Sequence, residues 1–271
     1  MPELPEVETI RLGLLPLLAG RRLQQLRLFR ANLRHPFPPD LSAQVEERIC
    51  RAIARRGKYL IFDFGGRGLL WHLGMSGRFQ LLADDAPPRL HEHLRLCLEG
   101  GLFYAYIDPR RFGAVDGWSG DPLAHPWLAG LGVEPLSDAF DGAALQQLAA
   151  GRRSPIKSLL MDSHLLVGVG NIYAAESLHR AAIDPRRQAA SLGDEECNRL
   201  AASIRTILQE ALAAGGSTIS DYRHPDGSSG YFAHAFAVYG RAGEACRRCG
   251  AIVAAIRQAG RSTYFCPACQ H

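Results

Sequence analysis

The sequence of 271 residues contains little lysine, few cysteines and no long apolar run. No stretch is apolar over the length that a transmembrane helix needs, so we expect no membrane partner. The N-terminus is acidic and rich in proline rather than basic and then apolar, which argues against a secretory signal peptide. We therefore expect a cytoplasmic protein.

The cysteines are too few and too unevenly placed for a disulfide framework. The chain has seven, an odd number, and four of them form two close pairs near the C-terminus. The other three, Cys50, Cys97 and Cys197, are scattered. This pattern is typical of a reducing compartment and of one metal site.

The positive charge comes almost entirely from arginine. Of the 31 lysine and arginine residues, only Lys58 and Lys157 are lysines, and the net charge is +4. Arginine suits bidentate phosphate contacts and stacking better than lysine does. A mildly basic balance permits a nucleic-acid partner without demanding one. Hydrophobic residues make up 47%, which is enough for the cores of one large or two ordinary domains.

The first half of the chain begins with a helix and continues in short strands. Apolar residues recur at helical spacing from Val7 to Leu18, and Gly20 ends that helix. Runs rich in aromatic and branched residues, separated by glycine pairs, predict strands at 58–64, 69–73, 94–98 and 102–107. Several short strands with glycine turns predict a sandwich or a barrel.

The second half is helical. A loop-like stretch at 117–135 marks the domain boundary, and helices are expected at 141–150, 154–161, 171–182 and 193–214. Residues 215–230 are rich in glycine, serine, histidine and aspartate, which predicts a mobile loop. Loops of this length are usually functional or disordered.

The C-terminal cysteines form two C-x2-C pairs, Cys246–Cys249 and Cys266–Cys269, separated by sixteen residues. This spacing predicts a tetrahedral Zn²⁺ held by four thiolates, with a two-strand hairpin between the pairs. So small a unit cannot bury enough surface alone, so the metal supplies its folding energy. The site is closed and hence structural. The alternative is a pair of disulfides or a redox dithiol, although no βαβ pattern surrounds the pairs.

The start of the chain, Pro2-Glu3-Leu4-Pro5-Glu6, is chemically unusual. Removal of Met1 would expose a secondary amine between carboxylates, and an α-amino group loses its proton more readily than lysine does. Attack of such an amine on a sugar carbon gives a cationic iminium, which is Schiff-base catalysis by the chain terminus. The ordinary alternative, which these residues alone favour, is that Pro5 begins a helix and the acids complement its dipole.

Two segments in the second half could bind phosphate. Ser154 and Pro155 are expected to cap and begin a helix that carries Lys157 in its first turn, where a bound phosphate would offset the unfavourable dipole. Gly168, Gly170 and an Asn171 cap would present backbone N–H groups at a second helix start. A solvated lysine and an ordinary helix–helix turn are the alternatives.

Two turns in the first half carry residues suited to unstacking bases. Arg110 and Phe112 lie in a turn that follows a strand, and Met75 lies in the turn after His72. An exposed aromatic ring can separate bases while a guanidinium fills the space of a missing one. The alternative is that Met75, Phe112 and His72 are core residues.

Taken together, these residues resemble those of the bacterial formamidopyrimidine-DNA glycosylase family, whose members remove oxidised purines such as 8-oxoguanine. The resemblance covers essentially the whole chain. It comprises PELPEVE at 2–8, GKYL at 57–60, HLGMSG at 72–77, DPRRFG at 108–113, MDSHLLVGVGNIYAAESL at 161–178, VYGR at 238–241 and the four paired cysteines.

The resemblance implies an α+β fold of two domains. An N-terminal β-sandwich with flanking helices, residues 1–131, precedes a helical domain with a helix–two-turn–helix motif, residues 132–238, and a zinc-ribbon hairpin, residues 239–271. Residues 215–232 resemble a lid over an everted base. The implied partner is damaged double-stranded DNA in the cleft between the domains, bound by a monomer that carries one structural zinc ion.

The resemblance also implies roles for single residues. Pro2 attacks C1′ of the damaged nucleoside, Glu3 is the acid–base partner, Glu6 helps to hold the terminal amine and Lys58 contacts the phosphate beside the lesion. The residues that resemble the backbone-gripping set are His72, Lys157, Asn171, Tyr239 and Arg261. Those that resemble the intercalating trio are Met75, Arg110 and Phe112.

The implied reaction is glycosylase chemistry followed by β- and δ-elimination, which leaves a one-nucleotide gap. Two rival interpretations remain. The endonuclease VIII branch, which acts on oxidised pyrimidines, shares Pro2 and Glu3, but Leu4, Met75 and the Arg110/Phe112 pair favour the purine branch. A non-catalytic protein that binds damaged DNA would not need Pro2, Glu3 and Lys58.

Overall fold

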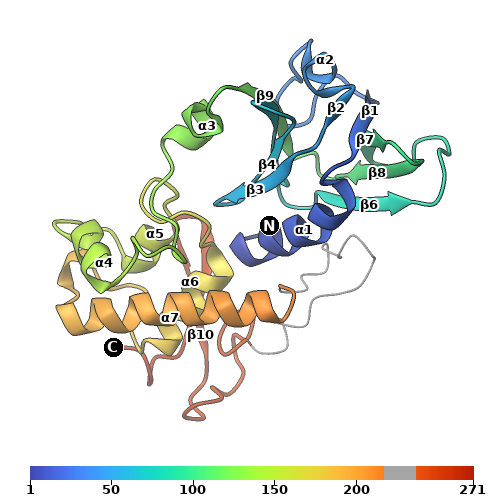
Figure 1. The fold of residues 1–271 in the computed structure, drawn as a ribbon. Coiled ribbons are helices and arrows are strands. Elements are labelled where there is room, and N and C mark those ends of the chain that lie inside the picture. Colours follow the sequence, from blue (N-terminus) through green and yellow to red (C-terminus); the bar gives the residue numbers. More distant parts are fainter. Residues whose placement is uncertain (217–235) are drawn as a thin grey trace. The chain divides into compact units, whose positions relative to one another are not determined.

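The computed structural model describes residues 1–216 and 236–271 (Figure 1). Over these residues the chain forms two compact units. The N-terminal unit comprises residues 1–129 with residues 215 and 216, and the C-terminal unit comprises residues 130–214 and 236–271. The ribbon residues expected at 239–271 therefore group with the helical residues. The three-part division remains a prediction.

Two antiparallel sheets build the N-terminal unit. One contains β1 (Arg22–Leu28), β2 (Arg48–Ile49), β6 (Arg78–Leu82), β7 (Glu92–Leu98) and β8 (Leu102–Ile107), in the order β2-β1-β7-β8-β6. The other contains β3 (Ala52–Arg56), β4 (Tyr59–Asp63), β5 (Arg67–His72) and β9 (Ala114–Ser119), in the order β3-β4-β5-β9. Of the two architectures that the strand pattern allowed, the structure is the sandwich.

Aromatic side chains from both sheets meet in the core of this unit. Trp71 lies 4.8 Å from Phe79 and 4.9 Å from Tyr106, between ring centroids, and Phe62 lies 5.9 Å from Trp71. Facing rings of this kind stabilise a core beyond the area that they bury. Helix α1 (Leu4–Leu18) packs on β3 and β4, and α2 (Leu41–Val45) packs on β1 and β5. The N-terminal helix thus rests on the sheet that contains β3 and β4.

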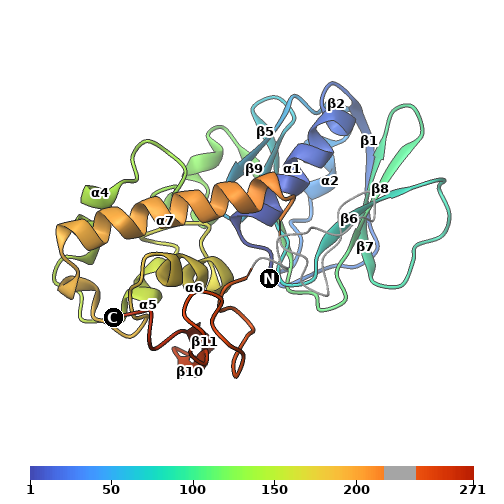
Figure 2. The ribbon, with the colours of Figure 1, turned by 90° about the horizontal axis from the view of Figure 1, so that it is seen from below.

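Four α-helices lie in the described part of the C-terminal unit. They are α4 (Gly142–Ala149), α5 (Ile156–Leu160), α6 (Asn171–Arg180) and α7 (Asp194–Ala213); a short α3 (Pro126–Ala129) precedes them in the N-terminal unit. The long α7 packs against α4 and α6, as Figure 2 shows. Its buried residues recur at helical spacing from Cys197 to Ala211, which explains why its pattern was readable in the sequence.

The C-terminal hairpin follows the helices. It consists of β10 (Ala254–Gln258) and β11 (Arg261–Phe265), paired in register from Ala254↔Phe265 to Gln258↔Arg261. Strand β11 packs against α6. The sandwich, the helical unit and the hairpin confirm the expected fold class. Within the described ranges no helix combines the length and apolar character that crossing a membrane requires.

Candidate functional site

The residues around Pro2 are buried and held by the first turn of α1. Glu3 precedes the helix, and its backbone N–H donates a hydrogen bond of 2.8 Å to Oε2 of Glu6. Glu3 and Glu6 are only 3% and 2% exposed, and Pro2 is buried as well. This hydrogen bond is one of the two that form a capping box between Glu3 and Glu6, and it fixes the backbone directly after Pro2.

The structure therefore gives Glu6 a partner one residue away from Pro2. Its carboxylate holds the Glu3 backbone, which is compatible with the predicted role of Glu6 in placing the terminus. Met1 precedes Pro2 in the structure, so the Pro2 nitrogen lies in a peptide bond. Gly216, at the start of the expected lid, packs against Glu6: a Cβ at this position would lie 3.3 Å from Glu6 Cγ. The rest of the expected lid, residues 217–232, lies outside the described residues.

Lys58 and His72 come together through the pairing of neighbouring strands. Lys58 follows Gly57, whose φ of 57° forms the tight turn between β3 and β4, and Tyr59 pairs directly with His72 across β4 and β5. Burial lowers the pKa of His72 to about 4, and the positive charges of Lys58 and Arg34 act in the same direction. His72 is therefore neutral at physiological pH.

The tautomer of His72 follows from its one defined partner. The backbone N–H of Gly74 donates to Nδ1 at 3.1 Å, so the proton of the neutral ring resides on Nε2. The ring of Tyr59 lies 4.9 Å away and limits its rotation. A neutral imidazole with an Nε2–H can donate to a phosphate oxygen without carrying charge into this half-buried position.

The two turns that carry the candidate wedge residues pack directly on each other. A Cβ on Gly74 would lie 2.3 Å from the carbonyl carbon of Phe112, so only glycine permits this approach. Phe112 is 45% exposed, and the guanidinium of Arg110 lies 5.1 Å from its ring centroid. Met75 is half-buried. Phe112 is thus not a core residue, which removes the ordinary alternative for that side chain.

Two polar residues that the sequence did not single out join these turns. Ser76 Oγ donates to Oδ1 of Asp108 at 2.5 Å, and the Gly113 N–H donates to Oδ2 at 2.8 Å. Asp108 has no exposed surface, and Ser76 is 5% exposed. The signal in the sequence was an aspartate placed just before a Pro-Arg-Arg turn, a common position for a residue that caps its own turn.

Lys157 is buried in the C-terminal unit rather than solvated. Its Nζ donates to Asn171 Oδ1 and Thr263 Oγ1, both at 2.6 Å, and to the carbonyl of Ser262 at 3.1 Å. The expected helix start was wrong: α5 begins at Ile156, with Pro155 at its N-cap, and has only five residues. Its dipole is correspondingly small, and neutral oxygens from α6 and β11 surround the ammonium group.

Asn171 is the first residue of α6 and not its cap, which is Gly170, so this expectation was also wrong. Its side chain accepts from Lys157 and donates from Nδ2 to the Ser262 carbonyl at 3.0 Å. The two predicted phosphate-binding residues are therefore brought together, and both attach to the start of β11. Their predicted contact with DNA remains a prediction.

Tyr239 is placed by a buried carboxylate that the sequence analysis missed. Glu176 accepts from the backbone N–H groups of Ala237, Val238 and Tyr239 at 2.8 to 3.0 Å. The Tyr239 ring lies 5.2 Å from that of Tyr264. Glu176 belongs to the same buried helix as Asn171, so α6 positions both.

Arg261 lies at the tip of the hairpin, where Ala259 and Gly260 have φ values of 45° and 77°. Such a turn presents Arg261 outward, and its side chain is exposed. It lines a pocket of about 200 Å³ whose walls also include Lys157 and Gln258. Arg261 is therefore a cation beside the buried Lys157 network.

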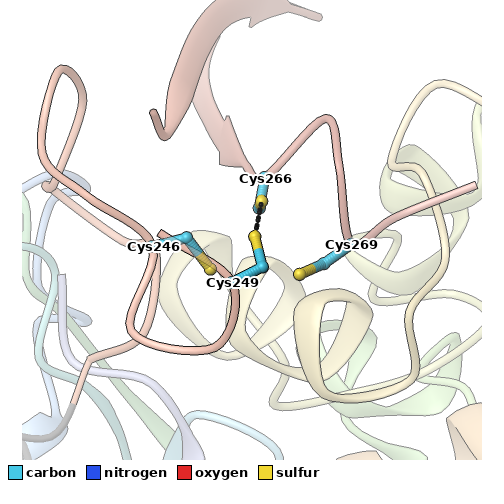
Figure 3. Close-up of side chains that lie close together, drawn as sticks. All are labelled: Cys246, Cys249, Cys266 and Cys269. Carbon is cyan, nitrogen blue, oxygen red and sulfur yellow. Dashed lines mark hydrogen bonds between the residues drawn. The ribbon is translucent and has the colours of Figure 1, made fainter. Parts of the chain in front are cut away.

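The four paired cysteines form a cluster suited to a metal ion, as Figure 3 shows. Their Sγ atoms all lie within 4.8 Å of one another. Thiolates bound tetrahedrally to Zn²⁺ at about 2.3 Å would lie about 3.8 Å apart, so the cluster fits zinc after small adjustments. The four cysteines of the cluster are Cys246, Cys249, Cys266 and Cys269.

The surroundings of Cys246 favour its thiolate. Burial opposes ionisation, but hydrogen bonds from the Arg248 and Cys249 backbone outweigh it and lower the pKa of Cys246 to about 6. His179 Nε2 lies 3.5 Å from the same sulfur and is itself buried. A side chain that orients a ligand in this way is usual around metal centres.

Family models match almost the whole chain. Residues 1–115 match the formamidopyrimidine-DNA glycosylase N-terminal domain, and residues 131–223 match its H2TH domain. Residues 243–271 match a zinc finger found in FPG and IleRS.

Similar proteins cover the full length as well. The formamidopyrimidine-DNA glycosylase of Laribacter hongkongensis is 51% identical over 100% of both chains. The crystal structure of the MutM (Fpg) protein of Thermus thermophilus is 44% identical, covers 99% of this chain and 98% of its own, and superposes with a TM-score of 0.89. A Lactococcus lactis Fpg mutant bound to DNA containing Fapy-dG is 36% identical, covers 100% of both chains and gives 0.92.

Proposed function

The chain belongs to the formamidopyrimidine-DNA glycosylase family, and from this premise we propose that it removes oxidised purines from damaged duplex DNA and then cleaves the strand. The observation that carries the proposal is the Pro2-Glu3 start, buried and held by Glu6, in a chain that matches the family over its full length. The substrates are formamidopyrimidines and 8-oxoguanine.

The chemistry begins at the Pro2 nitrogen, which requires prior removal of Met1. The nitrogen attacks C1′, the bond from C1′ to the base nitrogen breaks, and the base leaves with a proton. Glu3 protonates the sugar ring oxygen as the ring opens to an iminium cation. Because an α-amino group titrates about two and a half units below a lysine, a far larger fraction of it is unprotonated and reactive at pH 7 than of a lysine.

The lyase steps follow from the same cation. The iminium acidifies the 2′-hydrogen, its removal breaks the bond to the 3′ phosphate, and a second elimination breaks the bond to the 5′ phosphate. Water then hydrolyses the iminium and releases Pro2. A buried carboxyl such as Glu3 is suited to passing protons between these steps, since it is shielded from bulk water.

The remaining predicted residues hold and open the DNA. We assign the neutral His72, with its Nε2–H, to a phosphate oxygen, and Lys58 beside it to the phosphate next to the lesion. Met75, Arg110 and Phe112 fill the gap left by the everted nucleotide, which offsets part of the few kcal/mol that eversion costs. Lys157, Asn171, Tyr239 and Arg261 grip the backbone, with Arg261 the exposed cation among them.

Zinc supplies no chemistry in this scheme. When bound by the four cysteines it fixes the hairpin that carries Arg261, and the fit of the cluster supports this structural role. The residues that react are all in the N-terminal unit, whereas the hairpin belongs to the C-terminal unit.

Borohydride trapping tests the proposal directly. The processed protein, shown by mass spectrometry to begin at Pro2, should form a covalent adduct with a duplex that contains 8-oxoguanine. The Pro2→Gly variant should lose it, because a primary glycine amine differs in basicity and geometry. Pro5→Ala, which alters the same helix start without touching the nucleophile, is the matched control and should still form the adduct.

The outcome is decisive in either direction. An adduct formed by Pro2→Gly at the wild-type rate, or one that maps to another residue, would refute the mechanism. Equal cleavage by protein that still carries Met1 would do the same. Comparison of 8-oxoguanine with thymine glycol duplexes then tests the oxidised-purine preference.

A further inference from the structure

Asp108 occupies a position that the reaction scheme leaves unexplained. It lies at the end of β8, is completely buried, and touches both turns that carry the wedge residues. Its Oδ1 accepts from Ser76 in the Met75 turn, and its Oδ2 accepts from the Gly113 N–H directly after Phe112. One carboxylate therefore connects two segments that are otherwise separate in the chain.

The connection continues to the backbone of Arg110. The Arg110 N–H donates to Ser76 Oγ at 3.2 Å, so Ser76 receives one hydrogen bond and gives another. The Asp108 carbonyl accepts from the Arg111 N–H at 3.1 Å, and His93 Nε2 lies 2.9 Å from the same carbonyl. Each end of the second turn is thus fixed to Asp108 or to its partner.

A purely structural role explains this arrangement poorly. Asp108 is completely buried, where a carboxylate is costly, and the partners of its two oxygens are the neutral donors of Ser76 and Gly113. What a carboxylate adds is direction, because its two oxygens accept one hydrogen bond from each turn, at 2.5 and 2.8 Å.

We propose that Asp108 is a positioning residue for base eversion: with Ser76 it locks the Met75 turn and the Arg110–Phe112 turn into one rigid wedge. The inference rests on the proposed function, since it needs DNA whose bases must be separated. Asp108 touches no substrate itself. It acts through the three side chains that do, and a displacement of about 1 Å in such a group is enough to slow a reaction strongly.

Two variants break the connection in different ways. Asp108→Asn keeps the shape but offers a single acceptor oxygen for two donors. Ser76→Ala leaves the carboxylate intact but removes both the hydroxyl donor and the acceptor of the Arg110 N–H. Asp63→Asn is the matched control, because Asp63 also accepts two backbone N–H groups, those of Gly65 and Gly66, in a turn without wedge residues.

Two substrates separate eversion from chemistry. A duplex with 8-oxoguanine opposite cytosine must be opened, whereas a single strand with an abasic site has no partner strand and needs no wedge. In single-turnover assays, Asp108→Asn and Ser76→Ala should slow excision from the duplex by about tenfold or more. Both should cleave the abasic single strand at the wild-type rate, and Asp63→Asn should retain both reactions.

A second readout excludes a general loss of structure. If Asp108 acts through the wedge, Asp108→Asn should slow duplex excision less in a Met75→Ala background than in the wild type. The two substitutions impair the same wedge, so their effects should not be additive. Wild-type excision by Asp108→Asn, equal loss on both substrates, or full additivity with Met75→Ala would each overturn the proposal. An inactive wild-type protein would instead refute the proposed function, so the two failures are distinguishable.

Discussion

His72 should make the stability of the protein depend on pH in a predictable way. Its pKa is about 4 in the folded protein, against 6.5 for an unperturbed histidine, because burial and the charges of Lys58 and Arg34 disfavour the imidazolium. As the pH falls, His72 therefore becomes protonated near pH 6.5 in the unfolded chain but only near pH 4 in the folded chain. Stability from this group is complete above pH 6.5 and is lost as the pH falls towards 4.

The size of the effect follows from linkage. Between pH 7.5 and pH 4.5, the difference between these two pKa values corresponds to a loss of about 2 to 3 kcal/mol of unfolding free energy. His72→Asn removes the titration but keeps an acceptor for the Gly74 N–H. The difference in stability between the wild type and this variant should therefore shift by that amount over the same pH interval, with the wild type losing more.

Urea unfolding at a series of pH values provides the measurement. Other titrating groups, including the zinc ligands, contribute equally to both proteins and cancel in the difference. His91→Asn, at an exposed position, is the control for replacing a histidine by asparagine. A constant difference between wild type and His72→Asn, or a shift of opposite sign, would refute the argument about the neutral imidazole.

Two further predictions concern the C-terminal unit. Metal analysis should find one zinc ion per chain, and Cys249→Ser should lose it together with the hairpin fold; active protein without zinc would contradict this. Glu176→Gln should lower the unfolding free energy by about 2 kcal/mol, because the NH₂ group of glutamine replaces one of the two carboxylate oxygens and cannot accept from the N–H groups that this oxygen serves. Glu210→Gln, which breaks only an exposed pair with Arg180, should cost less than about 1 kcal/mol, and equal losses would count against the assignment.

Features that depend on neighbouring residues were readable without the structure. The spacing of the cysteine pairs specifies a ligand set, the glycine pairs specify turns, and the apolar period of α7 specifies a helix, because each is local. The position of Pro2 next to Met1 is covalent and needs no fold to establish it. Family membership likewise followed from motifs read in order.

The first residues of helices α5 and α6 could not be predicted from the local sequence. A Ser-Pro pair and a Gly-x-Gly-Asn run both predicted caps one residue away from the true ones. The Ser154 carbonyl is engaged instead by the distant Ala189 N–H, and the Ile156 N–H donates to Arg187. Contacts with a segment about thirty residues further on decide where α5 begins, and no local preference encodes them.

Only the tertiary structure decided which polar groups are buried together. Lys157 meets Thr263 across 106 residues and Ser76 meets Asp108 across 32, so neither pairing is visible as a pattern. The sequence by itself determined the chemical groups available: a proline that can become a terminal amine, four thiols and two lysines. The packing of sheets and helices determined which of them are desolvated, and desolvation sets the charge state of His72 and the cost of leaving Asp108 or Lys157 without partners.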